Sequence, residues 1–393
     1  MKLTAVWLAL ALSGAAVAAD LPVAKPESVG MSSQRLERID GWLRGVVERK
    51  EAAGFVSLVA RHGKVVHHKA FGTRGLDVAE PMPVNAIFDL ASMTKPITVA
   101  AALMLLEEGR YTLTDPISTW VPEYRSPQIE VAGGAPVAAK RAIAVKDLFT
   151  HGSGIFDPFS RAESMNFPTL AAYVKALSEK PLRYEPGSAW LYGSSHHLLG
   201  YLVQQASGVP LDKFVQERIL TPLEMRDTEY WPAEGKRRAI LVVNAKDDPM
   251  SVSRYSAEAA KAKTFIGGAS GLYSTAADYW RFSQMLLNGG TFNGHRILGP
   301  RTIRWMAENH IGDIATFTTP GTRFGLGLAV VTDPGASNLP YSKGTYYWSG
   351  SQGTVFWIDP AEDLVGVLMV QLTPSRLKLR EKFSALVYGA ILE

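Results

Sequence analysis

Two segments of the chain place a lysine three residues after a serine, close to one helical turn. The first pair is Ser92 and Lys95, and the second is Ser375 and Lys378. Side chains at this spacing lie on one face of a helix, so the lysine can reach the serine oxygen. Serine is a weak nucleophile unless a base stands beside it, and lysine can supply that base. About one such match is expected by chance in a chain of this length, so the surroundings must decide.

The surroundings favour the first pair. Ser92 precedes an apolar segment over residues 94–108 that is predicted to be a helix, and the start of a helix offers free backbone N–H groups. Lys95 is followed by many apolar residues, which favours a buried or cleft position over open solvent. Ser375 instead lies in a charged stretch. We therefore predict a nucleophile at Ser92; the alternative is a helix cap followed by a solvated lysine.

Two aromatic residues, Tyr192 and Trp348, stand next to small residues in segments that could approach this serine. Tyr192 follows a Pro-Gly turn and a strand-like run over residues 188–192, directly before a predicted helix. Trp348 lies in an aromatic strand that ends in Ser349 and Gly350, and small residues let a backbone approach a ligand closely. The alternatives are a structural tyrosine and a bulged strand with a buried tryptophan.

The composition excludes several kinds of chemistry. The 393 residues contain no cysteine, which excludes disulfides, thiol nucleophiles, iron–sulfur clusters and cysteine-based zinc sites. The Gly-x-Ser-x-Gly turn of α/β-hydrolases is absent. The eight histidines include pairs at 67–68 and 196–197 but no His-Glu-x-x-His spacing, so neither a metal nor a cofactor is expected. The net charge of +4 comes without a long basic run, so nucleic acid is not an expected partner.

The spacing of apolar residues predicts the elements that must position these side chains. Apolar residues at steps of three and four predict helices over residues 33–50, 94–108, 170–179, 197–206, 211–220 and 379–391. Runs rich in β-formers predict a hairpin over 55–60 and 65–68 with its turn at His62-Gly63, and strands over 354–358 and 364–370.

These elements predict an α+β fold of two lobes. Residues 20–85 and 263–393 are expected to form an α/β sandwich lobe, in which helices flank one antiparallel sheet closed by both ends of the chain. Residues 86–262 are expected to form an inserted, mostly helical lobe. Because clefts are common between lobes, we expect the active site there.

The N-terminus predicts export. Residues 1–19 have a basic start, a short apolar stretch and small residues before Asp20, the pattern of a secretory signal peptide. The alternative is an uncleaved anchor helix, for which the apolar stretch is short. We expect a bacterial protein that is periplasmic or secreted, acts on a small molecule and is not stably inserted in a membrane after cleavage. The oligomeric state stays open.

Three motifs in this order resemble the serine β-lactamase and penicillin-binding-protein superfamily, and within it the class C-like esterases known as family VIII carboxylesterases. The motifs are Ser92-x-x-Lys95, Tyr192-Gly-Ser194 and Trp348-Ser-Gly350. The segments 148–155, 267–272 and 324–327 also agree with the resemblance.

Two departures from the β-lactamase pattern decide between activities. Ser194 takes the place of an asparagine, and Trp348 takes the place of a lysine that supplies positive charge for a substrate carboxylate. An indole offers an apolar wall and one N–H donor but no charge. Uncharged acyl or alkoxy groups should therefore be favoured, which predicts a serine carboxylesterase for short-to-medium acyl chains.

The resemblance implies a serine β-lactamase-like fold and an acyl-enzyme mechanism on Ser92, with Lys95 and Tyr192 as the other catalytic residues. Which of these two takes the serine proton stays open, although the resemblance favours Tyr192. It also implies an oxyanion hole formed by the backbone N–H groups of Ser92 and Ser351. Substrate contacts are expected from Ser194, Trp348, Ser349 and Gly350.

Other functions remain possible from the sequence. The same serine could serve a cephalosporin-hydrolysing β-lactamase or a D-Ala-D-Ala carboxypeptidase, and some β-lactamase activity is compatible with the esterase prediction. A non-catalytic, penicillin-binding-like sensor is a further alternative, although it would not need nucleophile, lysine and tyrosine together. His151, in a glycine-rich loop, is expected to be structural because Lys95 and Tyr192 already cover the proton transfers.

Overall fold

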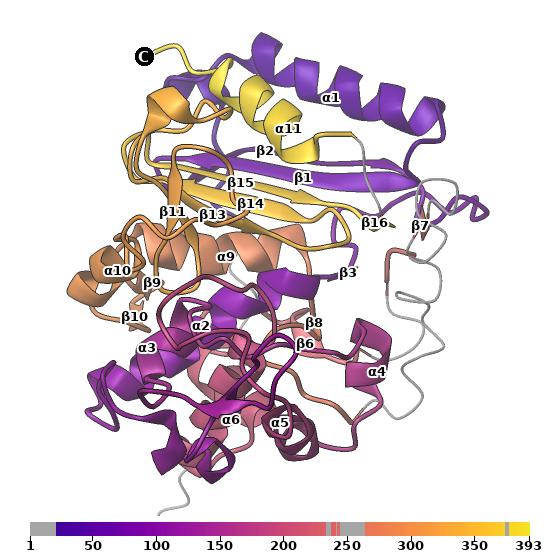
Figure 1. The fold of residues 1–393 in the computed structure, drawn as a ribbon. Coiled ribbons are helices and arrows are strands. Elements are labelled where there is room, and N and C mark those ends of the chain that lie inside the picture. The colour runs from indigo at the N-terminus through magenta and orange to yellow at the C-terminus, as the bar shows by residue number, and fades with distance from the viewer. Residues whose placement is uncertain (1–20, 233–236, 241, 244–263, 374–376) are drawn as a thin grey trace, which may run out of the picture.

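A seven-stranded antiparallel sheet built from both ends of the chain lies at the centre of the upper part of the molecule (Figure 1). A computed structural model describes residues 21–232, 237–240, 242–243, 264–373 and 377–393. The expected signal segment 1–19 and Ser375 lie outside these residues. In sheet order the strands are β11 (Thr322–Phe324), β12 (Ala329–Val331), β13 (Tyr346–Ser349), β14 (Val355–Asp359), β15 (Leu364–Met369), β1 (Gly54–Arg61) and β2 (Lys64–Gly72).

The central strands are apolar on both faces because both faces are covered. Every residue of β1, β14 and β15 is buried, so these strands show continuous burial rather than alternation. β1 and β2 form the hairpin expected from the sequence. Its turn residues His62 and Gly63 have φ angles of 51° and 67°, the left-handed conformation that a two-residue hairpin turn requires.

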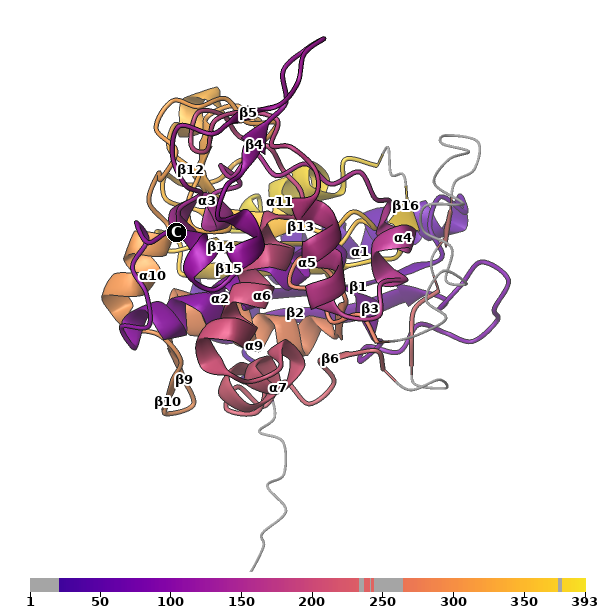
Figure 2. The ribbon, with the colours of Figure 1, turned by 60° about the horizontal axis from the view of Figure 1, so that its bottom comes forward.

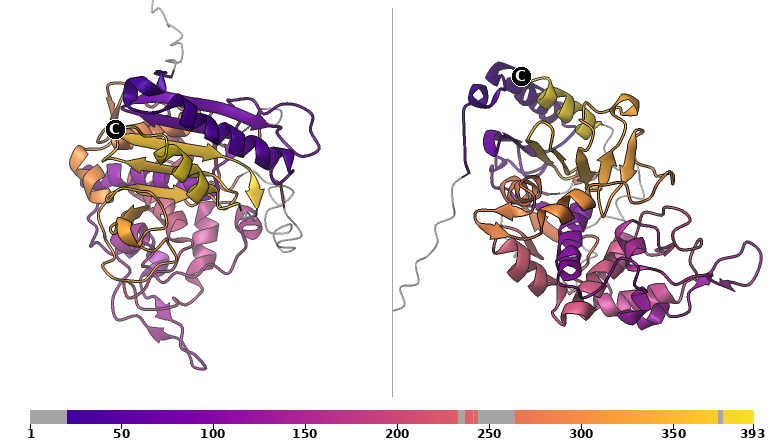
Figure 3. Two further views of the ribbon diagram at one scale, coloured as in Figure 1. Left: turned by 90° about the horizontal axis from the view of Figure 1, so that it is seen from above. Right: turned by 90° about the vertical axis from the view of Figure 1, so that its left-hand side faces the viewer.

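Helices cover the sheet on each face. α1 (Ser33–Glu48) and α11 (Leu379–Tyr388), the first and last long helices, pack side by side on one face (Figure 3). The Ser32 hydroxyl caps α1 by accepting a hydrogen bond from the Arg35 N–H at 3.2 Å. α9 (Ala276–Leu287) packs against the opposite face, on β15, β1 and β14.

Beyond α9 lies a mostly helical part in which α6 contacts α2, α3, α5 and α7 (Figure 2). α2 is apolar all round and buried over twelve of its residues, so it forms the core of this part. Besides α1, α9 and α11, the α-helices of the described chain are α2 (Thr94–Glu107), α3 (Val145–Phe149), α4 (Arg161–Met165), α5 (Leu170–Ser178), α6 (Ser195–Ser207), α7 (Leu211–Val215) and α10 (Pro300–Met306).

Short elements complete the described chain. Two-stranded or three-stranded ladders are formed by β3 (Phe88–Asp89), β4 (Gln128–Ile129), β5 (Val137–Ala138), β6 (Glu229–Tyr230), β7 (Val242–Val243), β8 (Leu272–Ser274), β9 (Thr291–Phe292), β10 (His295–Arg296) and β16 (Leu372–Thr373). Short 3₁₀ helices are η1 (Pro26–Val29), η2 (Ala91–Met93), η3 (Ile117–Thr119), η4 (Pro122–Tyr124) and η7 (Pro334–Ala336), and η5 (Gln216–Leu220) is a π-helical turn.

The α+β fold class predicted from the sequence is confirmed, with an antiparallel sheet flanked by helices. One local prediction was wrong, because residues 188–192 form no strand. The helical stretch expected over 211–220 is present, as α7 followed by the π-helical turn η5. Within the described residues, no helix combines the length and apolarity that crossing a membrane would require.

Candidate active site

Ser92 and Lys95 meet at the junction between β3 and α2. Ser92 lies in η2, two residues before α2 begins, and Lys95 lies in the first turn of α2. The Lys95 Nζ donates to Ser92 Oγ at 3.1 Å and to the Ala269 carbonyl at 3.0 Å. Lys95 is 4% exposed, as the apolar segment that follows it suggested. The pair expected from the Ser-x-x-Lys spacing is therefore formed.

The backbone that presents Ser92 is held in an unusual conformation. Ala91 has a φ of 45°, a left-handed conformation that is uncommon for a residue with a side chain. Its N–H donates to Asp89 Oδ1 at 2.8 Å, and the other oxygen of Asp89 accepts from Gln352 Nε2 at 3.2 Å. The buried carboxylate thus ties the residue before the serine to the turn after β13. Conformational strain of this kind persists only where neighbouring contacts enforce it.

Gly350 allows that turn to approach the serine segment. A Cβ on Gly350 would lie 2.5 Å from the Leu90 carbonyl oxygen and even nearer to Thr354 Oγ1. Such distances are far below van der Waals contact, so a larger residue would push the turn away from the backbone next to Ser92. Gly350 therefore positions the site through its lack of a side chain.

Replacing Gly350 with alanine is expected to lower the free energy of unfolding by about 1–3 kcal/mol and to reduce catalytic activity, because the clash displaces the Leu90–Ala91 backbone. Denaturant midpoints and kcat/KM measure the two effects. Gly41→Ala in α1 is the matched control, since a Cβ there meets nothing within 4 Å and alanine favours a helix. A Gly350→Ala enzyme with unchanged stability and activity would contradict this role.

Tyr192 lies beside this pair although its segment has no regular structure. The Leu191 N–H donates to the His151 carbonyl at 2.9 Å, and the Gly187 N–H donates to the Gly152 carbonyl at 2.7 Å. The 148–155 loop therefore holds the chain that leads to Tyr192. The Lys95 Nζ lies 4.6 Å from the centre of the Tyr192 ring, a cation–π distance.

Trp348 reaches the same place from the sheet. Its indole Nε1 donates to the Tyr192 hydroxyl at 3.3 Å, and the two rings have centres 5.4 Å apart. Trp190 stacks on the other side of Tyr192 at 5.9 Å, and Phe317 packs edge-on at 5.3 Å. These three aromatic rings thus fix the orientation of the Tyr192 phenol.

Ser92, Lys95 and Tyr192 border a cavity of about 190 Å³, whereas Trp348 packs on Tyr192 without lining it. It is lined by Ala91, Ser92, Lys95, Asp157, Phe159, Ser164, Tyr192, Gly193, Ser194, His197, Ala269, Ser270 and Ser351. Ser92 and Ser351, whose backbone N–H groups were expected to form an oxyanion hole, therefore border one cavity. Ser349 and Gly350 do not line this cavity and instead border a neighbouring surface pocket next to α11, which Ser351 also lines.

Ser194 is buried and held by other side chains. Its hydroxyl contacts the Asp157 carboxylate, to which the Tyr173 hydroxyl also donates, and the two hydroxyl oxygens are 2.8 Å apart. Burial and the neighbouring Asp157 charge raise the pKa of Tyr173 above its ordinary value. Tyr173 therefore stays a hydrogen-bond donor at neutral pH.

His151 packs against Tyr192, with ring centres 4.7 Å apart. Burial lowers the pKa of His151 well below its ordinary value, aided by the nearby charges of His196 and Lys95. Burial and Lys95 likewise lower the pKa of His196 to about 3. Both rings are thus neutral, and within the described structure neither ring nitrogen of His151 has a hydrogen-bond partner. This geometry favours the structural role expected of His151.

The sequence reasoning missed Asp157, Phe159 and Tyr173, which lie in a loop and a helix with no recognisable motif. Ala269 was noticed only as part of a glycine-rich stretch. The glycines explain its position, because a Cβ on Gly268 would lie 3.0 Å from the Cα of Gly200 in α6. Close packing on α6 brings the Ala269 carbonyl to Lys95.

A second constellation, Ser57–His67–Asp40, has the residue types of a catalytic triad. Ser57 Oγ lies 2.7 Å from His67 Nε2, and His67 Nδ1 lies 3.8 Å from Asp40 Oδ1. However, Ser57 is 0% exposed and the other two are 4% exposed, between α1 and the sheet. Burial lowers the pKa of His67 to about 4, so its ring is neutral. Without access for a substrate, this cluster is structural.

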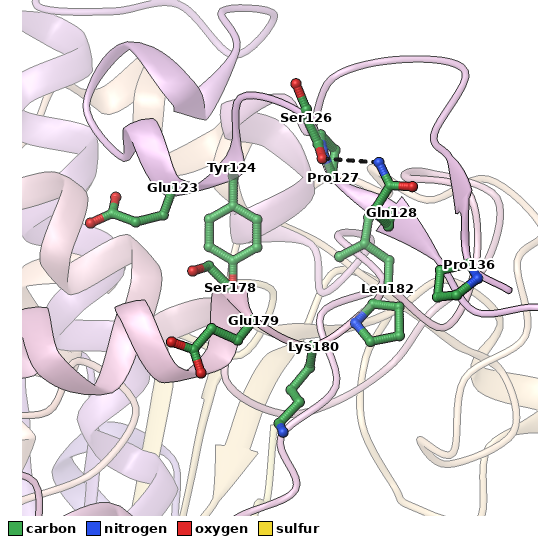
Figure 4. Close-up of a pocket in the computed structure, with 11 residues that line it drawn as sticks. Glu123, Tyr124, Ser126, Pro127, Gln128, Pro136, Ser178, Glu179, Lys180 and Leu182 are labelled. Atoms are coloured by element: carbon green, nitrogen blue, oxygen red, sulfur yellow. Dashed lines mark hydrogen bonds between the residues drawn. The ribbon is translucent and has the colours of Figure 1, made fainter.

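Another pocket, of about 160 Å³, lies beside η4 and the end of α5 (Figure 4). Ser178, one of the residues that line it, donates its hydroxyl to the Lys175 carbonyl at 2.7 Å rather than to a base. The Ser92 cavity is therefore the better candidate for chemistry.

Comparison with known proteins shows the family and the fold of the chain. A family model described as Beta-lactamase matches residues 39–388. Protein Rv1367c of Mycobacterium tuberculosis is 33% identical over 84% of this chain and 89% of its own, and Esterase EstB of Burkholderia gladioli is 27% identical over the same shares. The solved structure of EstCE1, described as a hydrolase with promiscuous acyltransferase activity, superimposes with a TM-score of 0.78 at 24% identity. It covers 91% of this chain and 99% of that chain, and shows the same fold.

Proposed function

The chain belongs to the beta-lactamase family of serine hydrolases, and we propose that it cleaves carboxylic esters through an acyl-enzyme on Ser92. The resemblance to family VIII esterases is confirmed, and the curated relatives include an esterase. The observation that carries the proposal is the contact of Ser92 Oγ with the Lys95 Nζ at 3.1 Å, in a cavity that Tyr192 also lines.

The proposed reaction has two steps. Ser92 Oγ attacks the ester carbonyl while its proton passes to the Lys95–Tyr192 pair, and the Tyr192 hydroxyl then protonates the leaving alcohol. The backbone N–H groups of Ser92 and Ser351 would stabilise the negative oxygen of the tetrahedral intermediate. Water hydrolyses the acyl-enzyme by the reverse proton path, and Ser92 is restored.

The side chains around the cavity support an ester rather than a β-lactam as the substrate. A β-lactam carries a carboxylate, which needs a cation when it is removed from water. Among the described residues that line the cavity, Lys95 is the one lysine or arginine, and its Nζ already contacts Ser92 and Ala269. Trp348 brings an indole to the position where the related β-lactamases carry a lysine. The cavity of about 190 Å³ is smaller than most pockets for drug-sized ligands, which supports short acyl chains.

The test compares p-nitrophenyl butyrate with a chromogenic cephalosporin. We expect kcat/KM for the ester to exceed that for the cephalosporin by about 100-fold, because the cephalosporin carboxylate finds no free cation. Steady-state absorbance assays on the same enzyme measure both. A higher kcat/KM for the cephalosporin would instead establish a β-lactamase. Stoichiometric acylation of Ser92 without turnover would establish the sensor alternative.

We also propose that the protein is exported by its first 19 residues, which lie outside the described structure. Mass spectrometry of the mature protein tests this by locating its N-terminus. The preference for short-to-medium acyl chains and the roles of Ser194 and Trp348 in forming the site are part of the same proposal.

A further inference from the structure

A carboxylate borders the same cavity as the proposed nucleophile. Asp157 lines it together with Ser92, Phe159 and Ser194. The Phe159 N–H donates to Asp157 Oδ1 at 2.9 Å, whereas the hydroxyls of Tyr173 and Ser194 contact Oδ2. The carboxylate is thus fixed at the cavity wall by three groups.

The groups that hold Asp157 are themselves immobile. Tyr173 is 0% exposed and Ser194 is 1% exposed. Tyr173 also packs against the rings of Phe159, Phe167 and His197 with centres 6.0, 5.3 and 5.1 Å away. Substrate binding therefore does not require the protein to order this wall first.

The carboxylate retains capacity to bind a ligand. A carboxylate offers about four acceptor positions, and at most three are used here. In the described part of the chain, no cationic side chain forms an ion pair with Asp157. The two hydroxyls and the N–H contact the carboxylate without bringing a positive charge to it.

We infer that Asp157 selects esters whose acyl group ends in an ammonium and rejects esters whose acyl group ends in a carboxylate. This inference rests on the proposed ester hydrolysis at Ser92 and names its substrate class. An ammonium donates to the open position of Asp157, and attraction between opposite charges in a partly dehydrated cavity strengthens that contact. A second carboxylate at the same place meets repulsion instead. Asp157 acts on binding and takes no part in the bond changes.

The test uses three ethyl esters whose acyl chains match in length: ethyl 4-aminobutyrate, ethyl pentanoate and monoethyl glutarate. At pH 7 they end in an ammonium, a methyl group and a carboxylate. We expect kcat/KM to fall about tenfold from the aminobutyrate to the pentanoate ester and about tenfold again to the glutarate ester. The first change removes a favourable contact, and the second introduces repulsion. Chromatographic release of ethanol measures all three esters without a coloured leaving group.

Asp157→Asn keeps the shape of the side chain and removes its charge. The ratio of kcat/KM between the aminobutyrate and the glutarate ester is expected to fall from about 100 to about 3. Because the readout is a ratio on one enzyme, a general loss of activity cancels. Glu163→Gln, at an exposed carboxylate that caps α4, is the matched control and should keep the wild-type ratio.

Equal kcat/KM values for the three esters on the wild-type enzyme would overturn the inference, as would an Asp157→Asn enzyme that keeps the ratio. The wild-type series decides the question even if the variant does not fold. Failure of the proposed function has a different signature, which is no hydrolysis of ethyl pentanoate and no labelling of Ser92 by a fluorophosphonate.

Discussion

Ser92→Ala is expected to lower kcat/KM for p-nitrophenyl butyrate by about 10⁴-fold or more and to abolish labelling by a fluorophosphonate probe. The serine oxygen is the atom that becomes acylated, and no neighbouring group can replace it in forming that bond. Lys95 would keep its second contact, with the Ala269 carbonyl at 3.0 Å, so the site should stay folded. Intact-protein mass spectrometry after brief exposure to the probe gives the labelling result directly.

Ser375→Ala is the matched control, because Ser375 begins the other Ser-x-x-Lys segment of the chain. This variant should keep wild-type turnover and labelling. If the Ser92→Ala enzyme still accepted one equivalent of probe and hydrolysed the ester, another nucleophile would carry the reaction, and both the mechanism and the argument about Asp157 would have to be abandoned.

Tyr192→Phe is expected to lower kcat by about 10²- to 10⁴-fold, with a smaller change in KM. The substitution removes only the hydroxyl that accepts from Trp348 Nε1 and leaves the ring in its aromatic packing. The loss should be larger for ethyl butyrate than for p-nitrophenyl butyrate, because an ethoxide needs a proton to leave whereas nitrophenolate does not.

That dependence on the leaving group separates a proton donor from a structural tyrosine. Tyr184→Phe provides the comparison, since the Tyr184 hydroxyl donates to the His151 carbonyl at 3.2 Å in the same region but does not line the cavity. Tyr184→Phe should lower kcat equally for both substrates, if it lowers kcat at all. Equal losses on both esters for Tyr192→Phe would assign the leaving-group proton to Lys95.

Local patterns predicted the elements well wherever one face or all faces of an element had to be apolar. The helix expected over 94–108 is α2, and the hairpin expected around His62-Gly63 is β1–β2. In both elements, the apolar pattern that predicts them comes from residues that lie only a few positions apart in the sequence. The strand predicted over 188–192 does not form, because this segment forms backbone hydrogen bonds with the distant segment 148–155 rather than with a sheet.

The sequence by itself determined that a serine and a lysine share one helical turn, that no chemistry based on cysteine is available, and that strands from both chain ends build a sheet. Only the tertiary structure decided which side chains surround that serine. Trp348 turns toward Tyr192 whereas Ser349 faces another pocket, and Asp157 enters the cavity from a loop without any motif. Spacing along a helix fixes neighbours across a few residues, but contacts between segments separated by more than sixty residues depend on how whole elements pack, which no local pattern encodes.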